Sequence, residues 1–199
     1  MRTRAAASVA AAAVVAGGCG GEDAARPPQV FAVSVPAALR PAEVATGFAA
    51  GDGRVVTVDH VLAGARAVRV GARPARVLRE RAQVDLAALA VPGVRAPALR
   101  TAGAAAGDAV TVRVLRGGSV RLLRGRVRRT ITAHVRPAPD ARAVVRPGLE
   151  LAVAVQRGDS GAPVLDQRER VVGIVFAQAA DRDDLAYAVS ASALAAVLR

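Results

Sequence analysis

Short apolar runs, interrupted every few positions by Gly, Pro or Asp, fill the chain from residue 31 onward. Runs of four to eight residues that alternate in polarity or are continuously apolar are typical of β-strands. Gly51-Asp52-Gly53 lies between two such runs and is a hairpin signal. The predicted strands are Phe31–Val35, Val44–Ala50, Arg54–Val58, Ala67–Val70, Ala75–Leu78 and Val84–Val91, followed by Ala109–Leu115, Val120–Arg129, Leu149–Val155, Pro163–Leu165, Val171–Phe176 and Ala186–Val189.

Helical patterns are few and short. Asp59–Gly64 is compatible with one helical turn, and residues 190–199 have a Ser cap and Leu/Ala spacing that predict a closing helix. Strands do not alternate with helices, which disfavours a parallel α/β sheet. We therefore predict an all-β fold of two packed six-stranded antiparallel β-barrels with a short C-terminal helix. The first barrel is expected at about 31–95 and the second at about 108–190, joined through Ala96–Gly107.

The first 19 residues predict a targeting segment outside the folded domain. Arg2 and Arg4 form a positive n-region, and Ala5–Ala16 is apolar but too short to cross a bilayer. The segment ends in Ala16-Gly17-Gly18-Cys19, which resembles a bacterial lipobox. We expect secretion across the cytoplasmic membrane and a lipid on Cys19 that anchors the protein to the outer face, in the periplasm or cell envelope. A cleaved secretory signal without a lipid is the alternative.

Residues 20–30 contain acids and two prolines and predict a flexible tether in front of a domain over 31–199. Cys19 is the single cysteine, so an intrachain disulfide is excluded.

Composition narrows the possible partners. Of the 199 residues 53% are hydrophobic but only 2% are aromatic, so the core must consist of Val, Leu and Ala. The 28 basic residues are all Arg and, with 16 acids, give a formal net charge of +12. Such a charge could meet anionic lipid or cell-wall polymer, but we favour a codon-biased, Ala/Arg-rich composition as its explanation. Nucleic acid is not an expected partner, because the sequence has neither aromatic-interleaved basic patches nor a helix-turn-helix pattern.

Gly158-Asp159-Ser160-Gly161-Ala162-Pro163 predicts a tight loop between buried strands. A serine held there can expose its hydroxyl beside backbone N–H groups, as a nucleophile with an oxyanion hole requires. The same residues are also ordinary β-turn composition. A serine nucleophile needs a base, and the sequence offers two histidines. His60 follows a predicted strand and can face a cleft, whereas His134, in Thr130–Pro137, is predicted to be a solvated loop residue.

A histidine base needs a carboxylate that orients it and stabilises the imidazolium. Asp85 is the one charge in the apolar run Val84–Val91, and a buried charge is costly unless it has a partner such as a cationic histidine. A strand-edge Asp85 that faces water is the alternative. Asp59 also competes for this role, but neighbours on an extended segment point in opposite directions, which disfavours its pairing with His60.

These segments resemble the trypsin-like serine proteases, and the likeness extends from about Val44 to Leu198. The sequence is most similar to bacterial envelope members, namely the high-temperature-requirement proteases and the actinobacterial membrane-anchored periplasmic proteases linked to acid and oxidative stress resistance. The matching segments are Thr46-Gly47-Phe48, Thr57-Val58-Asp59-His60-Val61, Val84-Asp85-Leu86-Ala87-Ala88-Leu89 and the loop that contains Ser160.

The resemblance implies a serine endopeptidase that acts on protein or peptide substrates and needs no metal or organic cofactor. It makes Ser160 the nucleophile, His60 the general base and Asp85 the residue that orients it. The backbone N–H groups of Gly158 and Ser160 would form the oxyanion hole, and Gly158 should adopt a positive φ. The resemblance further suggests envelope proteins or stress-damaged chains as substrates.

The substrate pocket can also be placed by this resemblance. Ala154 stands where proteases that cut after Arg or Lys carry an acid, and Phe176, Ala177, Gln178 and Ala186 would line the same pocket. We therefore expect a small or medium apolar side chain on the amino side of the cut.

Three departures from the family pattern carry further expectations. Ala162 replaces a second glycine after the nucleophile, which leaves a catalytically inactive binding module of the cell envelope as the alternative function. Asp159 pairs with a newly cut amino terminus in digestive relatives; a lipid-anchored Cys19 cannot supply one, so we expect an arginine or backbone donors to hold it. The sequence ends at Arg199, so we expect no PDZ-like domain and a lipid in place of a multipass membrane domain.

Overall fold

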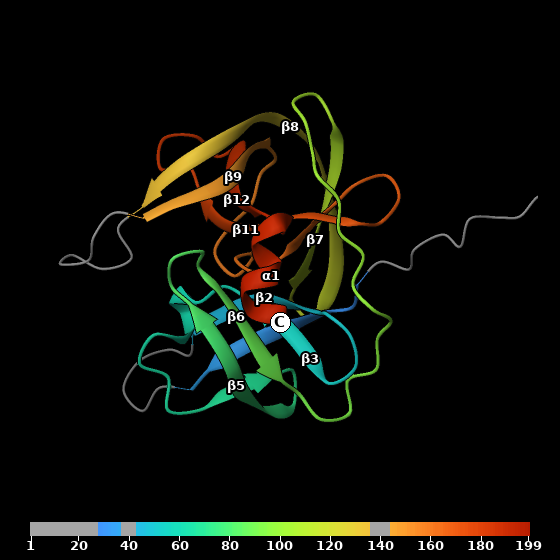
Figure 1. Ribbon diagram of the computed structural model, residues 1–199, viewed down its shortest axis with the longest axis vertical. Helices are drawn as coiled ribbons and strands as arrows, with labels where there is room; N and C mark the ends of the chain where they lie inside the picture. Colours follow the sequence, from blue (N-terminus) through green and yellow to red (C-terminus); the bar gives the residue numbers. More distant parts are fainter. Residues whose placement is uncertain (1–27, 37–42, 136–143) are drawn as a thin grey trace, which may run out of the picture.

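The computed structural model describes residues 28–36, 43–135 and 144–199, which form two β-barrels stacked on each other (Figure 1). Cys19 and the rest of the predicted targeting segment lie outside these residues. In the described part of the chain, no helix is both long enough and apolar enough to cross a membrane.

The first barrel contains six strands and closes in the order β1-β2-β3-β6-β5-β4. All its strand pairs are antiparallel. A short 3-10 helix, η1 (His60–Leu62), directly follows β3. The strands are β1 (Val30–Val35), β2 (Glu43–Ala49), β3 (Arg54–Thr57), β4 (Val68–Val70), β5 (Arg73–Arg81) and β6 (Leu86–Ala90).

The second barrel also contains six antiparallel strands, in the closed order β10-β11-β12-β9-β8-β7. The chain ends in the 3-10 helix η2 (Ala191–Leu194) and the single-turn helix α1 (Ala195–Leu198). The predicted all-β fold of two packed barrels is therefore confirmed. The strands are β7 (Ala109–Arg116), β8 (Ser119–Val135), β9 (Val144–Ala152), β10 (Pro163–Leu165), β11 (Val171–Gln178) and β12 (Leu185–Ser190).

Alternating burial explains why these segments form barrels. In β7, for example, Val110, Val112 and Val114 point into the barrel and are buried, while their neighbours are more exposed. β-Branched valine side chains pack well on a pleated surface, so a core with few aromatic residues can still be filled.

The two barrels share part of one hydrophobic core. Leu165 of β10, Ile174 of β11 and Val189 of β12 belong to the second barrel, yet they join the core cluster of the first. Leu194 of η2 and Val197 of α1 complete this contact, and α1 lies over the junction of the barrels in Figure 1. The extensive apolar contact fixes the position of one barrel against the other, which matters for a site built from both.

The strand pattern differs from the prediction most at β8, which continues to Val135 rather than ending at Arg129. β9 spans Val144–Ala152 rather than Leu149–Val155, and β5 spans Arg73–Arg81 rather than Ala75–Leu78. β8 pairs with β9 along its extra length, from Arg126 opposite Ala152 to Val135 opposite Val144. The run of arginines does not interrupt this two-stranded ribbon because their side chains stay exposed. His134 is solvent-exposed as predicted, but it lies on β8 and not in a loop.

Candidate active site

His60 and Asp85 are joined by three short contacts. His60 Nδ1 lies 3.0 Å from Asp85 Oδ1 and 2.9 Å from Oδ2, and the His60 backbone N–H donates to Oδ1 at 2.9 Å. The Asp85 side chain is 10% exposed, whereas that of His60 is 49% exposed. A buried carboxylate therefore holds one edge of a ring whose remainder reaches the surface.

The structure corrects the expected position of Asp85. It lies in the turn that precedes β6, not inside a strand, and it has a φ of +55°. This turn aims the carboxylate back at η1, and the backbone N–H of Asp59 donates to the Asp85 carbonyl at 3.2 Å.

Asp59, the competing acid, is not the partner of His60 Nδ1. Its side chain is half-buried beside η1. Burial raises the pKa of Asp59 above its ordinary value, and the nearby charges of Glu80 and Asp85 raise it further. His60 and Arg146 act in the opposite direction. The structure thus assigns the short contacts with the ring to Asp85.

Ser160 lies in a loop that is fastened to the first barrel. The backbone N–H of Thr46 on β2 donates to the Ser160 carbonyl at 2.8 Å, and the Thr46 hydroxyl donates to the Gly158 carbonyl at 2.9 Å. Thr57, three residues before His60, donates its hydroxyl to the Thr46 carbonyl at 2.9 Å. The loop that carries Ser160 is therefore bonded to the same residues that lead into His60.

Gly161 permits this close approach between the barrels. Its φ is +87°, and a Cβ at this position would lie 2.0 Å from the Thr46 carbonyl oxygen and 2.7 Å from the Thr57 hydroxyl. Any other residue would push the loop away from β2. Gly158 has a φ of +94°, which agrees with the conformation predicted for it.

The loop's amide groups divide into two sets. The N–H groups of Asp159, Gly161 and Ala162 donate to carbonyls of the second barrel at 2.7–3.0 Å. Within the described ranges, no protein acceptor takes the N–H of Gly158 or of Ser160. These two amides have the donor capacity that an oxyanion hole requires.

Asp159 is held by both kinds of donor that the sequence led us to expect. Its carboxylate is 1% exposed and accepts a two-pronged hydrogen bond from the Arg116 guanidinium, with Nε at 3.1 Å from Oδ1 and Nη2 close to Oδ2. The Gln156 backbone N–H donates to Oδ2 at 2.9 Å. The hydrogen bond to Asp159 raises the pKa of Arg116, so this guanidinium stays cationic.

The residues predicted to line the substrate pocket lie around one end of the β9, β11 and β12 strands. Ala154 follows β9 and is exposed, while Phe176 and Ala177 on β11 are half-buried. Gln178 is exposed and pairs in register with Ala186 of β12, which is fully buried.

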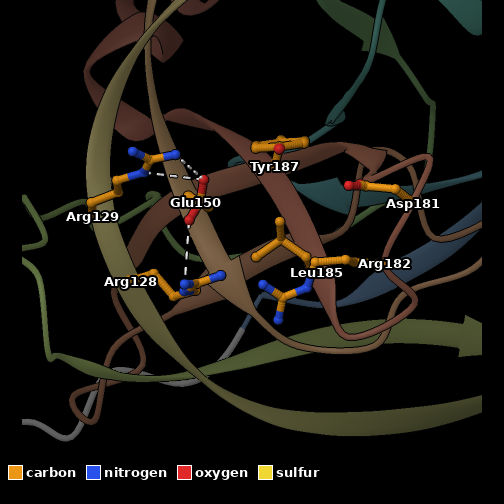
Figure 2. A pocket seen from close by; sticks show the side chains of 7 residues that line it. All are labelled: Arg128, Arg129, Glu150, Asp181, Arg182, Leu185 and Tyr187. Carbon is orange, nitrogen blue, oxygen red and sulfur yellow. Dashed lines mark hydrogen bonds and ion pairs between the residues drawn. The ribbon is translucent and has the colours of Figure 1, made fainter.

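A separate open cavity of about 410 Å³ lies beside these strands and is shown in Figure 2. Leu185 and Tyr187 of β12 form its apolar part, on either side of Ala186 in the chain. Glu150 accepts hydrogen bonds from Arg129 at 2.7 and 3.1 Å and lies 3.6 Å from Arg128 Nε. The remaining lining residues are Arg128, Asp181 and Arg182.

Two residues near the site could not be identified as such from the sequence. Arg116 and Arg146 both come from the second barrel and both contact buried carboxylates, Asp159 and Asp85 respectively. In a sequence with 28 basic residues, all of them Arg, no local signal separates these two from the exposed arginines. Their positions follow only from the strand register and the way the barrels pack.

A comparison with known families agrees with this fold. Residues 45–174 match the trypsin-like peptidase domain, a range that includes His60, Asp85 and Ser160. The chain belongs to the trypsin-like peptidase family.

The curated relatives are serine proteases of Mycobacterium tuberculosis. Serine protease Rv3671c of Mycobacterium tuberculosis is 34% identical over 164 residues, which cover 77% of this chain and 41% of that protein. This chain thus spans less than half the length of the curated relative. The crystal structure of the Rv3671c protease in its active form has a TM-score of 0.76 at 30% identity, covering 86% of this chain and 79% of the other.

The fold is also that of the HtrA-type proteases. HtrA-type protease AlgW, solved with a decapeptide, has a TM-score of 0.65 at 17% identity. The match covers 82% of this chain and 61% of the AlgW chain. The predicted resemblance to bacterial trypsin-like proteases is confirmed by these likenesses.

Proposed function

We propose that this protein is a serine endopeptidase that cleaves peptide bonds through an acyl-enzyme. Ser160 is the nucleophile, His60 the general base and Asp85 the residue that orients His60. The amides of Gly158 and Ser160 bind the oxyanion. The observation that carries this proposal is the pair of short contacts from Asp85 to His60 Nδ1, 2.9 and 3.0 Å long, beside a loop of the trypsin-like family pattern.

The Asp85 contact determines which ring nitrogen acts as the base. A carboxylate at Nδ1 accepts a hydrogen bond and so keeps the proton of neutral imidazole on Nδ1. Nε2 is then the basic nitrogen, and it takes the Ser160 proton as the hydroxyl attacks the substrate carbonyl. Asp85 stabilises the imidazolium that forms.

The remaining steps use the same residues. Charge that develops on the carbonyl oxygen is met by the N–H groups of Gly158 and Ser160. His60 then returns its proton to the leaving amine, which departs and leaves the acyl group on Ser160. A water molecule, deprotonated by His60, hydrolyses this ester and frees the enzyme.

We propose small or medium apolar side chains for the residue on the amino side of the cut. Ala154 supplies no carboxylate that would pair with Arg or Lys of a substrate. Phe176 and Ala177 offer half-buried apolar surface nearby, while Ala186 is fully buried. Gln178 adds one polar group, whose Nε2 donates to Asp183 at 3.1 Å.

The proposed place of action is the outer face of the cytoplasmic membrane, with envelope proteins or stress-damaged chains as substrates. This rests on the targeting pattern at residues 1–19 and the lipobox-like ending at Cys19. Incorporation of a labelled fatty acid by the full chain, and its loss in Cys19→Ser, is the expected result. Membrane-bound protein that carries no label would instead favour the plain secretory signal, or a different attachment.

The enzymatic proposal is tested by Ser160→Ala. We expect peptidase turnover to fall by about a millionfold, the loss seen when a triad nucleophile is removed. A fluorophosphonate probe should label the wild type at Ser160 and leave the variant unlabelled. Ser192→Ala, which removes an exposed serine hydroxyl from η2, should keep both activity and labelling. A wild-type protein without labelling or turnover on any peptide library would favour the inactive binding module.

A further inference from the structure

Arg146 places a buried cation beside the residues proposed for catalysis. It lies on β9 of the second barrel, and its side chain is only 3% exposed. Its Nη1 lies 3.5 Å from Asp85 Oδ2, and its Nη2 donates to the Ala82 carbonyl at 3.1 Å. The guanidinium carbon also lies 5.7 Å from the centre of the Phe176 ring, within the range of a cation–π contact.

This position is costly for an arginine. Removing a guanidinium from water carries a large desolvation penalty, which only good partners offset. Here the partners are incomplete, because Arg146 Nε is buried and has no hydrogen-bond partner among the described residues. A merely structural role would be filled more cheaply by an apolar side chain of similar volume. The arginine is therefore best explained by what it does to Asp85.

We propose that Arg146 is a positioning residue that holds Asp85 against His60 and keeps His60 neutral at lower pH than Asp85 alone would allow. This inference rests on the proposed function, because it assigns the control of the base in the same reaction. The Arg146 side chain has two effects in this proposal. One is geometric and acts on the turn that carries Asp85, and the other is electrostatic and acts on the His60 imidazole.

The geometric effect follows from where the two hydrogen-bonding nitrogens reach. Nη2 binds the Ala82 carbonyl at the start of the turn, and Nη1 contacts the Asp85 carboxylate at its end. Asp85 has a φ of +55°, a conformation that is unfavourable for a residue with a Cβ and must be maintained by surrounding contacts. Arg146 bridges the turn and so helps to maintain it, with the carboxylate aimed at His60.

The electrostatic effect follows from a shared oxygen. Asp85 Oδ2 lies 2.9 Å from His60 Nδ1 and 3.5 Å from Arg146 Nη1. Part of the negative charge that would stabilise an imidazolium is thus already matched by the guanidinium. A second positive charge on His60 is disfavoured by like-charge repulsion at this range. The active, neutral form of His60 therefore persists to lower pH.

The other charged groups around His60 act against Arg146. Asp59 precedes η1, Glu80 lies at the end of β5 and Asp85 in the turn before β6, and all three are acidic. Each of them favours a protonated His60. Arg146, from β9, is the opposing charge, and it is more deeply buried than Glu80 and Asp59. Its loss should therefore leave the acids unopposed.

Arg146→Met tests the proposal because it keeps an unbranched apolar stem but removes the charge. We expect the acid limb of the kcat/KM profile to move to higher pH by about one unit, together with a fall of about tenfold at the plateau. Arg146→Lys keeps a cation but loses the planar fork. This variant should return the acid limb to its wild-type pH, while the plateau of kcat/KM stays lowered. Arg124→Met removes the same charge from an exposed site and should leave the profile unchanged.

The readouts distinguish this inference from the proposed function. Rates are normalised to the fraction of sites that a fluorophosphonate titrates, so the plateau is corrected for unfolded protein. The pH at which the acid limb falls does not depend on how much protein is folded. A wild type without turnover would reject the proposed function itself. An active wild type whose acid limb is the same in Arg146→Met would reject the inference. If Arg146→Met does not fold, an acid limb in Arg146→Lys shifted by a full unit would reject it as well.

Discussion

Two buried aspartates, one on each side of the barrel junction, are held in the same manner. Counted over the whole residue, Asp85 of the first barrel is 7% exposed and Asp159 of the second is 1% exposed. Each accepts a backbone N–H at 2.9 Å, from His60 and from Gln156 respectively. Each also contacts an arginine of the second barrel, Arg146 for Asp85 and Arg116 for Asp159.

The difference lies in how complete the arginine contact is. Arg116 reaches Asp159 with two nitrogens, one on each carboxylate oxygen, and so satisfies both. Arg146 reaches Asp85 with one nitrogen at 3.5 Å, so that both carboxylate oxygens remain in contact with His60 Nδ1. A fully satisfied carboxylate can only fix a loop, whereas a partly satisfied one can still respond to the protonation of its neighbour. This difference supports the proposed roles, in which Asp159 fixes the Ser160 loop and Asp85 orients His60.

Exchanging each aspartate for asparagine gives the largest expected contrast. Both variants leave a guanidinium facing a neutral group, and each should lose about 2 kcal/mol of unfolding free energy. Asp85→Asn should also lower kcat by about ten-thousandfold, because an amide no longer selects the Nδ1–H form of His60 or stabilises its cation. Asp159→Asn should lower kcat by about tenfold, through a less rigid Ser160 loop. Urea unfolding and steady-state kinetics measure the two quantities.

Similar losses of activity in these two variants would contradict the assignment. The matched control is the double variant Arg116→Met with Asp159→Asn, in which neither group is left as a buried charge. Its stability should recover part of the loss seen in Asp159→Asn, as expected when both members of a pair are removed. A double variant no more stable than Asp159→Asn would show that Arg116 does not act through Asp159.

The strands and the serine-protease class could both be predicted from the sequence because both depend on local patterns. Alternating valines determine which face of β7 is buried, and this strand was predicted to within one residue. The short, fully buried strand β10 was predicted with its exact bounds. The residues around His60 and Ser160 carry motifs whose order is specific to one family. Local patterns of this kind need no knowledge of which strands meet in space.

What could not be predicted depends on contacts between distant segments. Asp85 was expected in a strand, because its positive φ arises from the turn before β6 and from partners on η1 and β9. Arg116 lies 43 residues before Asp159 in the chain. Arg146 is separated from Ala82 by 64 residues. Pairings at such separation are set by barrel register and packing, and one sequence contains no direct record of them.

Asp59 provides the smallest expected effect and completes the comparison, as an acid whose pKa is raised above its ordinary value by burial. Burial, followed by repulsion from Glu80 and Asp85, favours its protonated form in the folded protein. Its contribution to stability is therefore greatest at acid pH and declines as pH rises from the ordinary value of 3.8 through the folded-state pKa. Asp59→Asn mimics the protonated acid at every pH. It should match the wild type near pH 3 and exceed it at pH 7 by about 0.5 kcal/mol at most, since the half-exposed group is screened by solvent. Denaturant unfolding at the two pH values measures the difference, and a variant less stable than the wild type at pH 7 would mean that the charged form of Asp59 is stabilised by its surroundings.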